Sequence, residues 1–289
     1  MTETETRYCY RHPDRETGLA CSECGRPICP DCATFAAVGI RCPDHAGSGQ
    51  RRATPRIRPR PVHRAPGIAL ATTNAPVTKA LVAINVAIYL LGAAQGAGFN
   101  DPGGRIYAKL WLDAPDLYNG GWWRLVTTMF LHANVLHIGF NMLALYLIGT
   151  PVEQYLGRAR YIGLYFVSGL AGSAGALLQT PGITVGASGA IFGILGAMLI
   201  LEWQITGRLA GQAMTWIVIN LAISFGFAGI SWGGHIGGLI GGILVTLAYA
   251  HWRGGRAQYG QLGLGGVLGL VIVAAASVAI AYWRVRGYY

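Results

Sequence analysis

Residues 161–201 read YIGLYFVSGLAGSAGALLQTPGITVGASGAIFGILGAMLIL and contain no charged side chain. A helix that crosses a bilayer needs about 20 predominantly apolar residues, so this run is too long for one span. Gln179-Thr180-Pro181-Gly182 interrupts it with residues that favour turns. The run therefore predicts two consecutive transmembrane helices, over about 161–178 and 187–201.

Apolar segments of the same kind lie on both sides of this run. They cover about 77–94, 131–152, 212–228, 234–251 and 262–283. The chain is 53% apolar, and residues 80–289 hold only 10 of its 22 Arg and Lys and 5 of its 12 Asp and Glu. This composition excludes a disordered chain and an ordinary soluble enzyme. We expect an all-α polytopic membrane protein with a six-helix core over 77–252, followed by an additional seventh transmembrane helix and tail over 253–289.

Positive charge in the short loops predicts the orientation of this membrane body. With the N-terminus in the cytoplasm, the inner loops carry Arg158, Arg160, Arg208, Arg253 and Arg256, and the short outer loops at 179–184 and 229–233 carry no cation. Other cations oppose this assignment, namely Arg105, Lys109, Arg124, Arg284 and Arg286. The first three lie in a long Trp-rich outer loop, about 96–130, that we expect partly in the membrane plane. The prediction is a multi-pass cell-membrane protein with a cytoplasmic N-terminus.

The N-terminal part of the chain has a different pattern, with all six cysteines between residues 9 and 42. With two histidines they form four pairs of one spacing: Cys9-x2-His12, Cys21-x2-Cys24, Cys29-x2-Cys32 and Cys42-x2-His45. Eight such ligands suit two tetrahedral zinc sites. A disulfide framework is the alternative, but two pairs end in His, and disulfides are rare in a reducing cytosol. This segment has too few apolar residues to make a stable core. We therefore expect residues 1–46 to fold around two structural Zn²⁺ ions.

Residues 47–76 form a basic linker rich in Pro and Arg. It contains Arg51, Arg52, Arg56, Arg58, Arg60 and Arg64 with no acidic residue between them. Basic clusters bind nucleic acid in some proteins, but one just before a first transmembrane segment is better explained as a topology signal beside anionic lipid. The lipid bilayer is therefore an expected partner and nucleic acid is not. Lys79 and Lys109 are the only lysines, an arginine bias that points to a GC-rich bacterial genome.

Polar side chains inside the predicted spans are few, and four of them are expected at one outer depth. They are His137, Asn141, Ser188 and His235. Polar groups in spans are costly and usually functional. A Ser can supply a nucleophile and a His a base. A His and an Asn four residues apart on one helix face can donate hydrogen bonds to an oxyanion. Ser188 alone could be a packing residue and a lone His a proton relay, but the shared depth favours a catalytic site.

These residues stand in motifs that resemble the rhomboid intramembrane serine proteases over about 77–252. The motifs, in chain order, are Trp123-Arg124, His132 with His137-x3-Asn141, Gly186-x-Ser188-Gly189, and Gly234-His235-x-Gly237-Gly238. A seventh span after the six-span core also occurs in that family.

The rhomboid resemblance implies a role for each residue. Ser188 would be the nucleophile and His235 the general base, without an acidic third member. His137, Asn141 and the Ser188 backbone N–H would stabilise the oxyanion. The family usually has Tyr one turn after the nucleophile, packed against the base, and here Phe192 keeps the ring without the hydroxyl. The 212–228 segment and the turn at 230–232 would form the gate for a substrate helix.

The cysteine-rich segment resembles the B-box type of zinc finger. That resemblance implies an interleaved pairing, with one ion held by Cys9, His12, Cys29 and Cys32 and the other by Cys21, Cys24, Cys42 and His45. Both sites would be closed and structural, and the use would be a cytoplasmic protein-interaction module.

Two other functions are compatible with a multi-pass body. A catalytically weak or inactive rhomboid-like protein could bind membrane proteins as an adaptor, but it should lack Ser188 or His235, and this chain has both. A transporter would need polar or acidic residues near the midplane, whereas Glu153 and Glu202 flank spans at their inner ends. We predict a serine endopeptidase, a hydrolase that cleaves transmembrane segments of membrane-protein substrates with its active site towards the outer face and no cofactor for catalysis.

Overall fold

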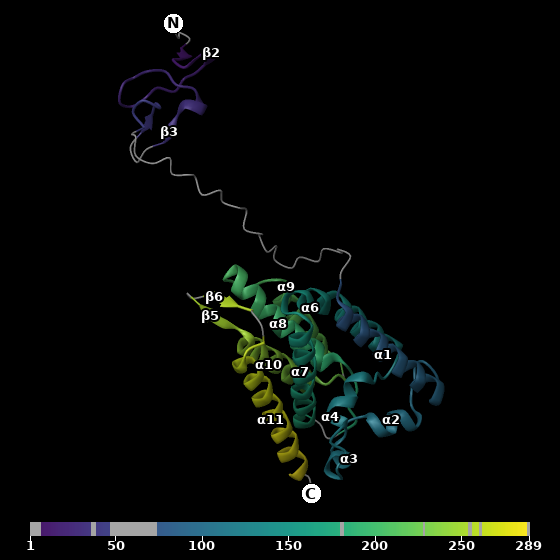
Figure 1. The fold of residues 1–289 in the computed structure, drawn as a ribbon. Coiled ribbons are helices and arrows are strands. Elements are labelled where there is room, and N and C mark those ends of the chain that lie inside the picture. The colour runs from purple at the N-terminus through teal and green to yellow at the C-terminus, as the bar shows by residue number, and fades with distance from the viewer. Residues whose placement is uncertain are drawn as a thin grey trace. The chain divides into compact units, whose positions relative to one another are not determined.

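A computed structural model describes residues 7–35, 39–46, 74–179, 182–227, 229–253, 256–259 and 262–287. The chain divides into two compact units, residues 1–63 and 64–289 (Figure 1). Most of the predicted linker with its arginine cluster, residues 47–73, lies outside the described residues, as do Thr180 and Pro181 of the predicted turn.

Short strands and cysteines build the first unit. Strand β1 (Tyr8–Cys9) pairs antiparallel with β2 (His12–Glu16), and β3 (Thr34–Phe35) pairs antiparallel with β4 (Ile40–Arg41). The 3-10 turn η1 (Pro30–Cys32) precedes β3. The buried cluster of the described residues consists of Ile28 and five cysteines, namely Cys9, Cys21, Cys29, Cys32 and Cys42. Apolar burial on this scale is too small to stabilise a domain.

Helices build the second unit. The long ones are α1 (Pro76–Gln95), α5 (Val135–Ala144), α7 (Arg158–Gln179), α8 (Ser188–Thr206), α9 (Gln212–Gly226), α10 (Trp232–Tyr249) and α11 (Leu264–Arg286). Helix α5 continues through the π-helical turn η3 (Leu145–Gly149) into α6 (Thr150–Leu156). A small hairpin, β5 (His251–Arg253) with β6 (Arg256–Gln258), lies between α10 and α11.

Six helices of the described chain are long and apolar enough to cross a membrane. They are α1, α5 continued to α6, α7, α8, α10 and α11. The remaining predicted span is α9, which is apolar but has 15 residues. At 1.5 Å per residue it is about 22 Å long, shorter than the roughly 30 Å hydrocarbon core. The prediction of an all-α polytopic membrane protein with a small Cys/His-rich N-terminal region is confirmed.

Glycine backbones bring α7, α8 and α10 into direct contact. Helix α7 packs against α8, α10 and α11 (Figure 1). A Cβ atom added to Gly238 would lie 1.9 Å from the carbonyl oxygen of Gly189, and one added to Gly242 would lie 2.1 Å from that of Gly193. No side chain fits at these crossings, which is the packing expected of small residues between transmembrane helices.

The connection between α1 and α5 (residues 96–134) is a folded layer of short helices. It contains α2 (Gly104–Leu110), α3 (Ala114–Tyr118), α4 (Arg124–Thr127) and the 3-10 turn η2 (Thr128–Phe130).

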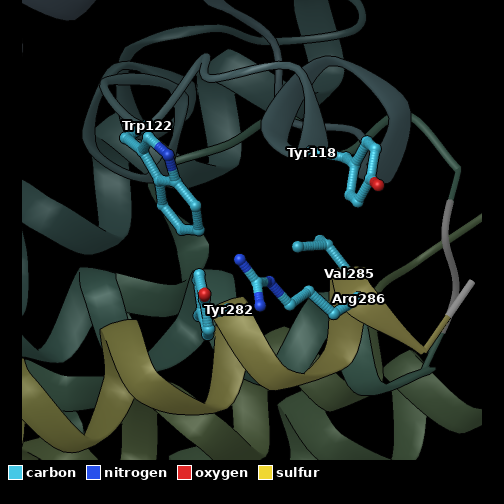
Figure 2. A pocket seen from close by; sticks show the side chains of 5 residues that line it. All are labelled: Tyr118, Trp122, Tyr282, Val285 and Arg286. Atoms are coloured by element: carbon cyan, nitrogen blue, oxygen red, sulfur yellow. The ribbon is translucent and has the colours of Figure 1, made fainter. Parts of the chain in front are cut away.

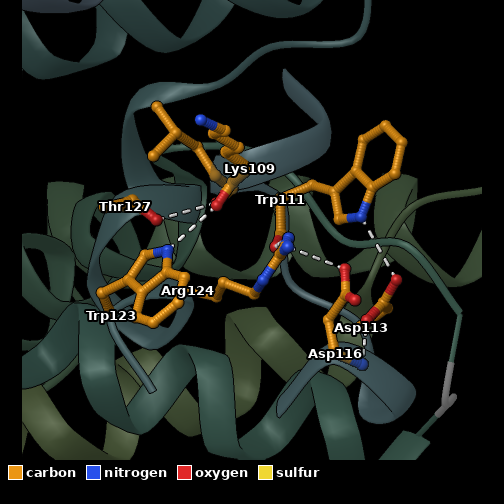
Figure 3. A network of polar contacts seen from close by, with 8 residues as sticks. Lys109, Trp111, Asp113, Asp116, Trp123, Arg124 and Thr127 are labelled. Atoms are coloured by element: carbon orange, nitrogen blue, oxygen red, sulfur yellow. Dashed lines mark hydrogen bonds and ion pairs between the residues drawn. The ribbon is translucent and has the colours of Figure 1, made fainter. Parts of the chain in front are cut away.

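Arg124 joins these short helices (Figure 3). Its guanidinium lies 2.8 Å from the Asp116 carboxylate and donates to the carbonyl oxygen of Trp111 at 2.8 Å. Trp123 Nε1 donates to the carbonyl oxygen of Lys109 at 2.9 Å. The Arg124 side chain is 9% exposed and the Asp116 side chain 40%, so the guanidinium is shielded from solvent while the carboxylate is partly open to it.

Glu153 holds the start of α1 from α6. Its carboxylate accepts hydrogen bonds from the backbone N–H groups of Val77 and Thr78, at 3.1 and 2.7 Å, and from the Thr78 hydroxyl at 2.8 Å. Glu153 is 2% exposed. The first N–H groups of a helix lack intrahelical partners and attract negative charge. Their hydrogen bonds to Glu153 therefore compensate for the burial of its carboxylate.

Replacement of Glu153 by Ala should destabilise the membrane body by about 2 kcal/mol or more, because it leaves buried donors unpaired. Glu153→Gln keeps one acceptor oxygen and should be intermediate. All eight tryptophans lie beyond residue 110, so thermal unfolding followed by tryptophan fluorescence in detergent reports on the body alone. The control is Glu16→Ala on β2, which is exposed and should leave the melting temperature unchanged. Equal melting of Glu153→Ala and the unmodified chain would contradict the capping role.

Candidate active site

Ser188 is the first residue of α8, and the chain that leads to it is held by the α1–α5 connection. Thr184 exchanges two backbone hydrogen bonds with Leu112, at 2.8 and 3.2 Å. The N–H of Gly186 donates to the carbonyl oxygen of Thr128 at 3.0 Å. Ser188 itself is half-buried. Because the first N–H groups of a helix have no intrahelical acceptor, a backbone donor is available beside the Ser188 hydroxyl.

His235 lies in the first turn of α10 and is held on two sides. Its ring stacks on that of Phe192 in α8, with centroids 4.2 Å apart and planes at 14°. Its Nδ1 lies 2.6 Å from Ser224 Oγ in α9. The turn begins at Ser231, whose hydroxyl oxygen accepts from the Gly234 N–H at 3.2 Å. His235 is only 8% exposed, so the imidazole sits inside the helix bundle.

Glycines bring the start of α8, which carries Ser188, close to the start of α10, which carries His235. A Cβ on Gly172 of α7 would lie 2.9 Å from the Cα of Gly189 and 3.0 Å from the carbonyl oxygen of Gly234. Gly189 follows Ser188, and Gly234 precedes His235. The two residues that the sequence predicts as nucleophile and base therefore lie on helices in backbone contact.

Within the described part of the chain, Ser188 Oγ makes no hydrogen bond, to His235 or to any other residue. Phe192, which stacks on His235, lies four residues and so about one turn after Ser188. The base thus packs on the same face of α8 that carries the serine. Catalytic hydrogen bonds are often long without substrate and tighten in the bound complex.

His137 approaches the serine loop from α5. A Cβ on Gly186 would lie 2.8 Å from His137 Nε2. His137 Nδ1 accepts from the Ala133 N–H at 3.3 Å, so the neutral ring carries its proton on Nε2, on the side of the loop. Asn141 is buried one turn later, and its Nδ2 donates to the carbonyl oxygen of His137 at 2.8 Å. The His137 ring therefore presents an N–H donor next to the residues that precede Ser188.

His132 is fully buried beside His137. The two rings meet edge to face with centroids 5.0 Å apart. The Tyr107 hydroxyl donates to the carbonyl oxygen of His132 at 2.9 Å, and neither ring nitrogen of His132 has a partner among the described residues. The His132 ring therefore packs against His137, and its backbone is held by Tyr107.

Ser224 is absent from the residues predicted above, although it makes the shortest side-chain contact to His235. Helix α9 is apolar over most of its length, and Asn220 and Ser224 form a polar pair four residues apart on one face. That pair is the signal in the sequence that could have drawn attention to it, since polar groups in apolar helices usually have a function.

The cysteine-rich unit contains two clusters that could hold metal ions. One is formed by Cys9, His12, Cys29 and Cys32, and the other by Cys21, Cys24, Cys42 and His45, with the ligand atoms of each within 4.8 Å of one another. These are the two interleaved sets that the B-box resemblance implies. The Nδ1 of His12 lies 3.8, 3.3 and 3.4 Å from the sulfurs of Cys9, Cys29 and Cys32. Ligands about 2.0–2.3 Å from a tetrahedral zinc ion are separated by roughly 3.5–3.8 Å, so the donor set and the spacing fit such an ion.

Comparisons with known proteins decide the family of the membrane body. A family model described as Rhomboid domain matches residues 119–252. YdcA of Bacillus subtilis, named for the same family, is 36% identical over 149 residues, which are 47% of this chain and 74% of YdcA. The chain belongs to the rhomboid family. The Rhomboid protease GluP of Bacillus subtilis is 36% identical over 168 residues, 57% of this chain and 32% of GluP. RHOMBOID-like protein 1 of Arabidopsis thaliana is 40% identical over 145 residues, 48% of this chain and 36% of that protein.

The chain thus spans about a third of GluP and about three quarters of YdcA. The rhomboid match at 119–252 includes His137, Asn141, Ser188 and His235. It leaves out the cysteine-rich unit and α11.

A hollow of about 520 Å³ lies away from these residues, between α3 and the end of α11 (Figure 2). Tyr118, Trp122, Tyr282, Val285 and Arg286 line it. The Arg286 guanidinium lies 4.3 Å from the centre of the Tyr282 ring. None of the candidate residues of the rhomboid site lines this hollow, so it is separate from that site.

Gly186→Ala tests the loop that places Ser188. Gly186 has φ +135°, and an added Cβ would press on His137 Nε2, so the substitution should cost about 1–3 kcal/mol of stability and lower the melting temperature. Gly139→Ala is the matched control, because a Cβ there meets open space on helix α5 and Ala favours helix. If both variants melt like the unmodified chain in the tryptophan assay, the loop is not constrained as described.

Proposed function

We propose that this protein is an intramembrane serine endopeptidase that hydrolyses a peptide bond in or beside a transmembrane segment of membrane-protein substrates. The observation that carries the proposal is the buried His235 imidazole, stacked one turn after Ser188 on α8 in a rhomboid-family helix bundle. The name Rhomboid protease of the relative GluP supports the same activity.

Ser188 acts as the nucleophile and His235 as the general base. Ser188 Oγ attacks the scissile carbonyl carbon while its proton passes to His235 Nε2, and the carbonyl oxygen becomes an oxyanion. The tetrahedral intermediate collapses as His235 returns that proton to the leaving amine, which leaves an acyl-serine. A water molecule, deprotonated by His235, then attacks the ester carbonyl, and the carboxylate product departs with Ser188 reprotonated.

Three donors meet the oxyanion in this proposal. They are the backbone N–H of Ser188, the Nε2–H of His137 and the side-chain amide of Asn141. The Nε2–H of His137 lies beside the loop before Ser188, because a Cβ on Gly186 would lie 2.8 Å from that nitrogen. Donors fixed in a water-poor site stabilise developing charge more strongly than water does, and loss of one typically costs about a hundredfold in rate or more.

Phe192 keeps the His235 ring parallel to its own and shields one face from water. The stack needs only an aromatic ring, so a hydroxyl at this position is not required for orientation. The short α9 and the turn at 230–232 would form the entrance for a substrate helix.

The orientation is proposed from charge. With a cytoplasmic N-terminus, the inner loops hold Arg158, Arg160 and Arg208, and Ser188 and His235 fall near the outer face. The cleavage site would then lie in the outer part of the substrate segment.

The two Cys/His clusters are proposed to bind two structural Zn²⁺ ions and to present a cytoplasmic protein-interaction surface. Each cluster has four protein ligands, which closes a tetrahedral site to water and favours a structural role over a catalytic one.

Ser188→Ala and His235→Ala should each lower cleavage of a fluorescently labelled transmembrane reporter about a thousandfold or more, because each removes one half of the nucleophile–base pair. The assay uses the full chain in detergent or proteoliposomes. The control is Ser277→Ala on α11, whose hydroxyl donates to the carbonyl oxygen of Val273 in the same helix. Persistent cleavage by Ser188→Ala would exclude the proposed chemistry.

Metal analysis of the purified chain should find about two zinc ions, one for each closed tetrahedral site. Cys29→Ser should remove one ion and Cys21→Ser the other, since each belongs to a different cluster. Ser22→Ala, next to a ligand but outside both clusters, is the control and should keep both ions. A stoichiometry of one or none in the unmodified chain would contradict the double site.

A further inference from the structure

Ser224 occupies the position on His235 that a carboxylate occupies in a catalytic triad. Its Oγ lies 2.6 Å from Nδ1, the ring nitrogen on the opposite side from Nε2. Ser224 is 2% exposed and His235 8%, so water does not compete strongly for this contact. Helices α9 and α10 contain no Asp or Glu, and Glu202 of α8 is engaged elsewhere, accepting from the Ala213 N–H at 3.0 Å.

A count of protons gives the direction of the bond. A serine hydroxyl has one proton and can also accept. Ser224 Oγ lies 2.6 Å from the carbonyl oxygen of Asn220, which can only accept, so the hydroxyl proton points there. The remaining lone pairs of Ser224 Oγ can then only accept from His235, which places a proton on Nδ1. A neutral imidazole with N–H at Nδ1 has its free lone pair at Nε2.

We infer that Ser224 is a positioning residue for the proposed reaction: it holds His235 in the tautomer and orientation in which Nε2 can take the proton of Ser188. This inference rests on the proposed protease function. The Phe192 stack fixes the plane of the ring, and the Ser224 bond fixes its rotation within that plane. The relay from the Asn220 carbonyl through the Ser224 hydroxyl to Nδ1 is neutral, so it orients the base without adding a charge to the apolar interior.

The base is thereby tied to α9 as well as to its own helix. Helix α9 has few contacts with α8 and α10, and the Ser224–His235 bond joins it to the candidate site. Among the described residues, the Phe192 ring on α8, the Ser224 hydroxyl on α9 and His137 on α5 lie about the His235 ring.

The test compares Ser224→Val with Ser224→Thr in the full-length protein. The two side chains have nearly the same shape, but only Thr has a hydroxyl that can accept from Nδ1 and donate to the Asn220 carbonyl. Ser224→Val should lower kcat about tenfold to a hundredfold with KM little changed, since general acid–base catalysis contributes about 10²–10⁴ and a mispositioned base loses part of it. Ser224→Thr should restore most of that loss. Thr215→Val, which removes an exposed hydroxyl from the same helix, is the control and should match the unmodified enzyme.

A second readout does not depend on proteolysis. In protein with ¹⁵N-labelled histidine, with the His235 signals assigned by their loss in His235→Gln, the unmodified chain and Ser224→Thr should show the proton on Nδ1. Ser224→Val should show a mixture or the opposite tautomer. Ser224→Ala also lacks the hydroxyl and replaces the Val variant if that variant fails to fold.

Equal kcat and the same tautomer in the Val and Thr variants would overturn the inference. A loss of kcat with an unchanged tautomer would overturn it too, because the loss would then be structural. A chain that shows the tautomer change but cleaves no substrate would instead refute the proposed protease function, so the two failures are distinguishable.

Discussion

The backbone contact among α7, α8 and α10 is the constraint on which the membrane body depends. Lipid tails are as apolar as leucine, so burial alone gives these helices little reason to associate, and close packing has to supply the attraction. At Gly238 the missing side chain lets the carbonyl oxygen of Gly189 come within 1.9 Å of where a Cβ would stand. The same crossing carries Ser188 and His235, each next to a glycine of the contact. The separation of nucleophile and base is therefore set by the packing that holds the bundle together.

Within that packed body, two buried charged side chains are held by polar partners from other segments. The Glu153 carboxylate meets the first N–H groups of α1, and the Arg124 guanidinium meets Asp116 and the Trp111 carbonyl. Unpaired polar groups in an apolar medium cost several kcal/mol, so each pair also fixes the elements that carry it. Arg124 stiffens the layer that holds the chain before Ser188, and Ser224 fixes the ring of the base. The partners of the candidate residues thus help to position the site.

The two units are stabilised in different ways. The small N-terminal unit buries Ile28 and its cysteines, and its interleaved ligand sets can draw four distant segments together around metal ions. The membrane body has apolar side chains in abundance but no water around its spans to drive them together. Its helices are instead held by close backbone packing at crossings where glycine has no side chain. Cysteine is therefore confined to the N-terminal unit, and glycine is frequent at the helix crossings of the membrane body.

Local chemistry in the sequence was enough to predict the spans, the four ligand pairs and the polar residues His137, Asn141, Ser188 and His235. Apolar length, a fixed x2 spacing and the rarity of polar groups in lipid can each be seen within a few residues of chain. The tertiary structure alone decided that Glu153 caps a helix whose Val77 lies 76 residues earlier, that α9 is shorter than its predicted span, and that Ser224 contacts Nδ1 of His235. These features depend on how each helix is rotated and where it crosses its neighbours. Rotation and crossing are set by contacts between segments far apart in the chain, and local periodicity does not contain them.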